Sequence, residues 1–231
     1  MLGSLTSLFG YVIRATDGDI GNVNDFLFED DTWVLKYLVV KTGAWLHGRR
    51  VLITPAALGQ PDWSSHSLPV KLTRIEVQNS PDINADMPVS LQQLTLLHEY
   101  YGWPAYAAGT GFAYIPMAPP QFTEQEKEQL AAIEKASDPH LRSARQVTGY
   151  RMQAIDGGIG HVDDFIVNSA SWVISSLVVD TGKWLTVKKV LISPQAISAI
   201  SWGERRVHVD LTTDAIKNSP EYDPTTLEPS V

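Results

Sequence analysis

Residues 10–26, GYVIRATDGDIGNVNDF, return 139 residues later as residues 149–165, GYRMQAIDGGIGHVDDF. The same offset holds without a gap as far as Asn79-Ser80-Pro81, which matches Asn218-Ser219-Pro220, and 31 of the 72 aligned positions are identical. Six of the seven tryptophans pair off in this alignment: Trp33 with Trp172, Trp45 with Trp184, and Trp63 with Trp202. Chance does not maintain such identity over an ungapped stretch, so the chain is a tandem duplication.

The residues that the two copies share are of two kinds. Turn formers recur at matched positions: Asp17-Gly18 with Asp156-Gly157, Gly21 with Gly160, Thr42-Gly43 with Thr181-Gly182, and Pro55 with Pro194. Between these turns, apolar residues alternate in short runs, which indicates strands with one buried face. In the first copy they are Ile20, Val23, Phe26, Val34, Leu38, Val40, Val51, Ile53, Leu68, Val70 and Leu72. We therefore expect five or six short antiparallel strands in each copy.

This pattern predicts a mainly β protein built of two small SH3-like antiparallel β-barrels. An open sheet of this size would leave long unpaired edges and a thin core, so a closed barrel is the better arrangement. The first repeat is expected over residues 1–83 and the second over residues 149–231. Each should end in a short helix, with Thr73 and Thr212 as its N-terminal caps.

The intervening segment, residues 84–148, belongs to neither repeat. Apolar residues at spacings of three and four predict an amphipathic helix over residues 90–101. Thr123 followed by Glu126 forms a capping-box pattern and predicts a second helix over residues 123–136. We expect a partly helical linker.

Composition excludes several classes of function. The chain has no cysteine, which rules out disulfides, thiolate nucleophiles, cysteine-bound zinc and iron–sulfur clusters, and fits a cytoplasmic location. Its formal charge of −8 argues against a nucleic-acid partner, since such affinity depends on clustered Lys and Arg. No apolar run has the length of a transmembrane helix, and the start of the chain lacks the basic residues of a secretory signal.

Motifs for metal binding and catalysis are missing as well. The acidic residues around Asp17 and Asp25 lack the spacing of a calcium-binding EF-hand, and no histidine has a counterpart in the other copy. Gly157–Gly160 precedes a strand pattern rather than a helix, so it is not a phosphate-binding loop. No G-x-S-x-G nucleophile motif occurs. We expect no catalytic residue, no metal and no cofactor.

Two groups of residues are candidates for an interaction surface. Tyr100, Tyr101 and Trp103 form the densest aromatic cluster, a composition enriched in interfaces, although a helix docked on its own barrel would look the same. Lys41 and Lys71 occupy positions where the second copy has Asp180 and Asp210, so the two copies present different charges. Trp45 and Trp184, each just after a Thr-Gly turn, are further candidates for stacking over a groove, with burial in the core as the alternative.

Each copy resembles the PRC-barrel family, which is named for the cytoplasmic domain of the photosynthetic reaction-centre H subunit. The matching motifs are Gly10-Tyr11, Asp17-Gly18-x-Ile20-Gly21-x-Val23-x-Asp25-Phe26, Leu38-Val39-Val40 and Val51-Leu52-Ile53-x-Pro55, with the same motifs in the second copy from Gly149 to Pro194. The linker motifs Tyr100–Pro104 and Asp138–Ser143 resemble those of bacterial members of this family that contain two barrels. The resemblance implies the barrel fold and a non-catalytic role, because the family carries no catalytic residue.

The leading hypothesis is a non-enzymatic protein-interaction or scaffold module that binds another protein or itself. One alternative is a small-ligand or enzymatic site in the cleft between the barrels, where repeats related by a twofold axis often form pockets. The family resemblance also implies two further roles. These are peripheral association with a membrane or photosynthetic electron-transfer complex, and an adaptor role in RNA processing or ribosome assembly, against which the acidity of the chain argues.

Overall fold

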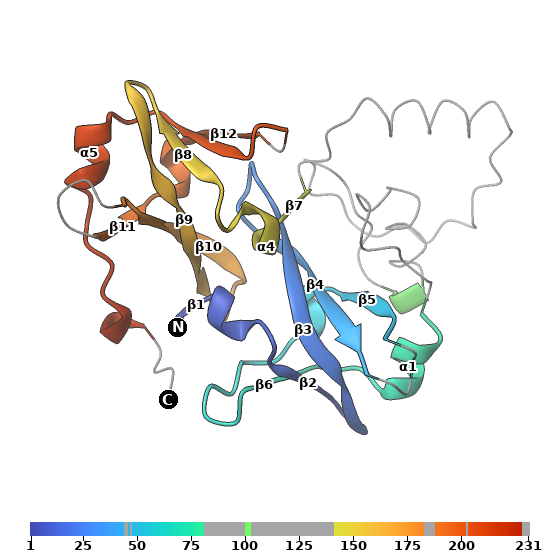
Figure 1. Cartoon of the computed structure of the whole chain (residues 1–231). Coiled ribbons are helices and arrows are strands. Elements are labelled where there is room, and N and C mark those ends of the chain that lie inside the picture. Colours follow the sequence, from blue (N-terminus) through green and yellow to red (C-terminus); the bar gives the residue numbers. More distant parts are fainter. Residues whose placement is uncertain are drawn as a thin grey trace, which may run out of the picture.

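The computed structural model describes residues 1–43, 46, 48–80, 100–102, 141–182, 188–201 and 203–227. It is mainly β, with two sheets and a few short helices (Figure 1). The helix predicted over residues 123–136 and most of that over residues 90–101 lie outside the described residues, as do Trp45, Trp103, Trp184 and Trp202.

The first repeat forms a sheet in the order β5-β4-β3-β2-β6. Its strands are β2 (Val12–Ala15), β3 (Gly18–Glu29), β4 (Leu35–Thr42), β5 (Arg50–Ile53) and β6 (Ser67–Pro69). The second repeat forms a sheet in the order β11-β10-β9-β8-β13-β12. Its strands are β8 (Arg151–Ala154), β9 (Gly157–Asn168), β10 (Val173–Asp180), β11 (Lys189–Ile192), β12 (Ile197–Ser201) and β13 (Arg206–Val209).

The expectation of purely antiparallel sheets is wrong at one place in each repeat. Strands β2 and β6 pair in parallel, and so do their counterparts β8 and β13. Parallel neighbours need a crossover connection, and the chain between β5 and β6 supplies it through the short helix η3 (Pro55–Ala57) and the loop after it. Pairing among the described strands closes neither sheet into a ring, so the two closed barrels stay a prediction.

The Asp-Gly turns have a role beyond that of joining two strands. Asp17 Oδ1 accepts a hydrogen bond of 2.7 Å from the backbone N–H of Arg74, the first residue of helix α1 (Arg74–Gln78). The counterpart Asp156 Oδ1 accepts one of 2.7 Å from Thr213 N–H, which opens helix α5 (Thr213–Lys217). Each turn is therefore tied to the helix that ends its repeat.

Both predicted helix caps are confirmed. Thr73 and Glu76 form a reciprocal capping box at the start of α1. Thr212 Oγ1 accepts from Ala215 N–H at 3.1 Å at the start of α5. The short helices thus begin where side chains satisfy their first backbone N–H groups.

The two repeats exchange their first strands. Strand β1 (Leu2–Ser4) pairs with β9 of the second repeat, in the register Leu2 opposite Asn168. Strand β7 (Leu141–Ser143), which lies within the predicted linker 84–148 but occupies the position equivalent to β1, pairs with β3 of the first repeat, in the register Leu141 opposite Glu29. The two registers are related by the repeat offset, so the exchange is reciprocal and follows a local twofold axis. Figure 1 shows β1 beside the yellow-to-orange sheet and β7 beside the blue one.

The same axis passes between Val34 and Val173, which form an antiparallel bridge and are each other's counterparts. On either side, Ile174 N–H donates to Trp33 O and Leu35 N–H donates to Trp172 O, both at 2.8 Å. Both tryptophans have positive φ, 59° and 56°, a conformation that is rare for bulky side chains. These turns place the tryptophan carbonyls within reach of the other repeat, which offers a reason for the strain.

One continuous hydrophobic core runs through both repeats. At the junction, Phe28 lies 5.5 Å from Phe165 and Phe26 lies 6.0 Å from Trp172, measured between ring centroids. The alternating residues that the sequence predicts as core, from Ile20 to Leu72, are buried, except that Val34 at the axis is partly exposed. The repeats therefore pack as a single body. No helix in the described part of the chain has the length and apolar character needed to cross a membrane.

Candidate interaction groove between the repeats

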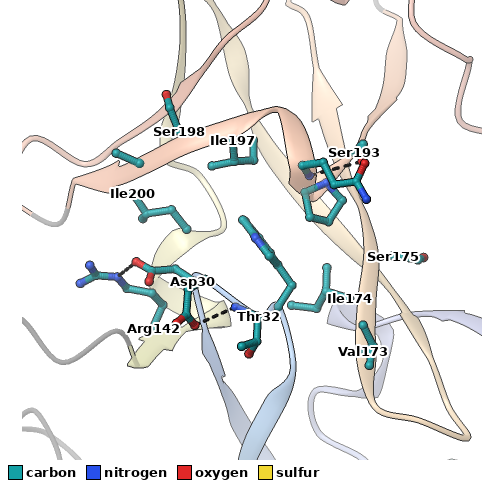
Figure 2. A pocket seen from close by; sticks show the side chains of 15 residues that line it. Asp30, Thr32, Arg142, Val173, Ile174, Ser175, Ser193, Ile197, Ser198 and Ile200 are labelled. Atoms are coloured by element: carbon teal, nitrogen blue, oxygen red, sulfur yellow. Dashed lines mark hydrogen bonds and ion pairs between the residues drawn. The ribbon is translucent and has the colours of Figure 1, made fainter. Parts of the chain in front are cut away.

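A groove of about 880 Å³ lies where the two repeats meet on one side of the local axis (Figure 2). The first repeat contributes the turn Asp30–Trp33, and β7 contributes Arg142. The second repeat contributes the start of β10 (Val173–Ser175), the residues Ser193–Gln195, and Ile197–Ile200 of β12. The groove thus brings together four segments that are distant in sequence: residues 30–33, 142, 173–175 and 193–200.

The polar end of the groove is an ion pair between Arg142 and Asp30. Arg142 Nε lies 2.6 Å from Asp30 Oδ2, and the two side chains are only 10% and 11% exposed. Removing both charged groups from water costs free energy, and the attraction between them offsets this cost. Such a shielded pair therefore fixes the positions of the two side chains more than it stabilises the fold. The third ionisable group among the described lining residues, Asp31, is exposed at the rim. The described rim is therefore slightly acidic.

The opposite wall is apolar and comes from an edge strand. Figure 2 shows Ile197 and Ile200 directed from β12 toward Asp30 and Ile174, with Ser198 on the other face of the strand. Ile200 is buried, whereas Ser198 and Ala199 are exposed. Strand β12 hydrogen-bonds to β13 along one edge, and no other described strand pairs with it.

The position related by the local axis is filled instead. Gly3, the counterpart of Arg142, packs under Trp63, and a Cβ added to Gly3 would stand 2.7 Å from the indole ring. Gln60 Nε2 donates to Ser169 O at 3.1 Å and bridges the repeats there. The described residues of the two sides differ at several positions, among them Arg142 for Gly3, Asp30 for Ser169, Ala199 for Gln60 and Ile200 for Pro61; Trp202, the counterpart of Trp63, lies outside the described residues.

Two carboxylates hold the exchanged strands: Asp164, which is buried, and Asp25, which is partly buried. Asp164 accepts hydrogen bonds from the Ser4 hydroxyl and, at 3.0 Å, from the Thr6 backbone N–H. Its counterpart Asp25 accepts from the Ser143 hydroxyl and, at 2.9 Å, from the Arg145 backbone N–H.

Burial raises the pKa of both Asp25 and Asp164 above the ordinary value of 3.8, although the hydrogen bonds that they accept lower it in part. Burial of each carboxylate costs free energy, and the hydrogen bonds to the segment from the other half of the chain offset part of this cost.

The structure places the predicted surface residues away from this groove. Tyr100 donates from its hydroxyl to Glu76 O at 3.0 Å, and its ring packs edge-on against Tyr101 with centroids 4.9 Å apart. Tyr101 is partly buried against the core, and burial raises its pKa to about 12. This pair therefore contacts its own first repeat, as the alternative interpretation of the aromatic cluster expects.

The two predicted lysines lie on the first repeat. Lys41 is exposed on β4 opposite Arg50 of β5, and Lys71 is exposed just after β6. Neither is among the lining residues of the groove. Trp103 lies outside the described residues, and the role of all these side chains in binding stays a prediction.

One group in the described part of the chain has the composition of a metal site. Ligand atoms of His161, Asp163 and Asp180 lie within 4.8 Å of one another on the outer face of β9 and β10. Lys189 Nζ lies 2.7 Å from Asp163 Oδ2, and this bond raises the pKa of the lysine. An ammonium group therefore already supplies a positive charge to the cluster.

Comparison with models of known protein families gives no match for this chain, and comparison with curated proteins gives none either. The PRC-barrel assignment therefore stays a prediction that rests on the sequence motifs.

The groove residues were missed because the argument from sequence followed what the copies share. Leu2-x-Ser4 and Leu141-x-Ser143 also obey the repeat offset. Extending the alignment to them would have brought out the contrast between Gly3 and Arg142.

Proposed function

We propose that this protein is a non-catalytic binding protein that holds a protein partner in the groove between its repeats. The single observation that carries the proposal is the loss of symmetry at the junction. Arg142 and Ile200 stand on the open side, where Gly3 and Pro61 lie on the filled side. Two copies of one repeat could pack in the same way on both sides of the local axis. A groove on one side alone is therefore a feature that stability does not require.

The chemistry of the described lining residues supports binding rather than catalysis. Serine hydroxyls are present at Ser175, Ser193 and Ser198, but none of the described lining residues is a histidine, which a serine nucleophile commonly uses as its base. The mixture of an apolar wall and a shielded ion pair is typical of recognition surfaces, where apolar contacts give affinity and polar groups give orientation.

The test compares the two sides of the local axis. The groove variant carries Asp31→Arg and Ala199→Arg, both at exposed positions, and the control carries Ala170→Arg at the counterpart of Asp31. Tagged wild type and variants are used to recover partners from the native host, with mass spectrometry as the readout. We expect wild type and control to recover the same partner and the groove variant to recover about tenfold less. Equal recovery by all three proteins contradicts the proposal.

The predicted lysine surface is tested in the same experiment. A variant with Lys41→Asp and Lys71→Asp changes two exposed charges on the first repeat. If this variant alone loses the partner, binding uses the lysine surface and the groove is not the site.

A second candidate function is the binding of a small ligand. The groove volume of about 880 Å³ lies in the range of ligand pockets. Thermal-shift screening with a metabolite set, on wild type and the groove variant, would detect such a ligand as a stabilisation of wild type alone.

The resemblance to PRC-barrel proteins supports three narrower proposals. The repeats are two barrels of that family, the protein is cytoplasmic, and the partner belongs to a membrane or photosynthetic electron-transfer complex. Co-sedimentation of the chain with membranes of the host tests the last proposal, and release by mild salt would mark peripheral association.

A further inference from the structure

Strand β12 has the features of an edge that accepts another strand. Its residues, ISAIS, contain no proline and no charged side chain, and the irregularity in its pairing with β13 is confined to the step between Ile197 and Ala199. Proline and charged residues usually protect exposed edges, because an unpaired row of backbone N–H and C=O groups can recruit a further strand. The counterpart of this segment in the first repeat contains Pro61 and the bridging Gln60. One edge is therefore blocked, whereas no strand in the described part of the chain occupies the related edge.

We propose that the partner enters the groove as an extended segment that adds to β12 along the edge that no described strand occupies. This inference rests on the proposed function and specifies the form of the ligand. Strand addition obtains affinity from backbone hydrogen bonds and selectivity from alternate side chains. The groove supplies both, because the backbone edge of β12 runs along it and Ile197 and Ile200 form its wall.

The groove also defines the side chains of the occupant. Alternate side chains of a strand point to the same face, so the residues that face Ile197, Ile200 and Ile174 should be apolar. Asp31 is exposed at the rim, and the described basic residue of the lining, Arg142, is held by Asp30. Charge complementarity therefore favours a Lys or Arg at one end of the segment.

The probe is the synthetic octapeptide Lys-Val-Thr-Val-Thr-Val-Thr-Lys, whose two lysines allow either strand direction. Two control peptides carry N-methyl groups on the three valine amides or on the three threonine amides. Successive backbone N–H groups of a strand point to opposite edges, so only one of these sets can face β12. Binding to the full-length protein is measured by calorimetry.

We expect one methylated peptide to bind about 30-fold more weakly, as for two lost backbone hydrogen bonds, and the other to bind within about threefold of the parent. Asp31→Arg should weaken the parent peptide about threefold or more, and Ala170→Arg should leave it unchanged. Equal binding of both methylated peptides would show that pairing does not use one edge, and it would overturn the inference.

Hydrogen exchange gives a readout at the strand itself. Peptide binding should slow exchange of backbone amides within Ile197–Ser201 and leave the counterpart segment 58–62 unchanged. Ile200 and Val207 form a non-hydrogen-bonded pair, so the backbone N–H of Ile200 points away from β13. Ile200→Pro should abolish peptide binding, whereas Ile200→Val should retain it, since valine keeps the backbone N–H. Should Ile200→Pro fail to fold, the methylated peptides decide the question without any change to the protein.

Two outcomes separate this inference from the proposed function. If the groove variant loses the cellular partner while the octapeptide shows no dependence on methylation, the groove binds a partner of another form and strand addition is wrong. If wild type forms a concentration-dependent dimer that Ile200→Pro abolishes, the occupant is a second copy of the chain, which also overturns the inference.

Discussion

Substitution of Asp164 tests whether a buried carboxylate holds the exchanged first strand. Asp164→Ala removes the acceptor for the Ser4 hydroxyl and the Thr6 backbone N–H, both from the other end of the chain. Asp164→Asn keeps the shape and can accept the same backbone bond while it donates to Ser4. The two variants therefore separate the loss of the contact from the loss of the charge.

The expected cost follows from the contacts. Hydrogen bonds to a charged group contribute about 1.5–3 kcal/mol each, and two of them cross between the repeats. Removing the carboxylate also relieves the burial that raises its pKa, which offsets part of this loss. We expect Asp164→Ala to lower the free energy of unfolding by about 2–4 kcal/mol and Asp164→Asn by about 1 kcal/mol.

The pH dependence has a definite sign. The pKa of Asp164 is raised in the folded protein, so between the ordinary value of 3.8 and the raised value the folded state binds more protons than the unfolded state. The contribution of Asp164 to stability is therefore fully present below the ordinary value and falls as pH rises through the raised one. Relative to Asp164→Asn, wild type should lose stability as pH rises across this window.

Urea unfolding followed by tryptophan fluorescence measures these differences, since buried Trp33 and Trp172 lie at the junction of the repeats. The control is Asp19→Ala, an exposed carboxylate 3.9 Å from Arg14, for which a loss of less than about 0.5 kcal/mol is expected. If Asp164→Ala costs no more than this control, the carboxylate does not hold the strand and the reasoning is refuted.

Three further predictions follow from the junction. Gly3→Ala should lower the free energy of unfolding by about 1–3 kcal/mol, because its Cβ would stand 2.7 Å from the Trp63 ring. A shift of tryptophan emission would report the displaced indole, and unchanged stability and emission would contradict the close packing. Phe165→Ala should cost about 3–5 kcal/mol in urea unfolding, since its ring is fully buried against Phe28, whereas truncation of exposed Ile75 should cost far less. Cleavage at a protease site inserted within residues 104–122 should leave the two halves together in gel filtration, since β1 and β7 each pair with the other half. Separate elution of the halves would contradict the exchanged arrangement.

Local features of the fold could be predicted because local chemistry determines them. Thr73 and Thr212 are caps wherever a short helix follows, and Asp-Gly marks a turn between strands in either copy. Alternation identified the buried faces, since the period of a strand is two residues whichever partner it finds. Because the sequence is repeated, each turn and each buried face could be assigned independently in both copies.

The parallel pairs β2–β6 and β8–β13 depend on where the chain re-enters the sheet, which periodicity does not encode. Likewise, β1 and β7 have only three residues each, too few for any periodic signal, and their partners are decided by the fit between the repeats. The left-handed backbone at Trp33 could not be predicted either, because bulky residues rarely adopt it without tertiary compensation.

A site in the cleft between the repeats was one predicted alternative, but the residues that line the groove were not predicted, for a related reason. Residues common to both copies report what each repeat needs in order to fold, and they gave the turns and the core. A groove on one side of a local twofold axis can arise only from positions where the copies differ, such as Gly3 and Arg142, or Pro61 and Ile200. In a duplicated chain whose halves share one core, the shared residues therefore explain the fold, and the differences at the junction are where a site specific to one side must be sought.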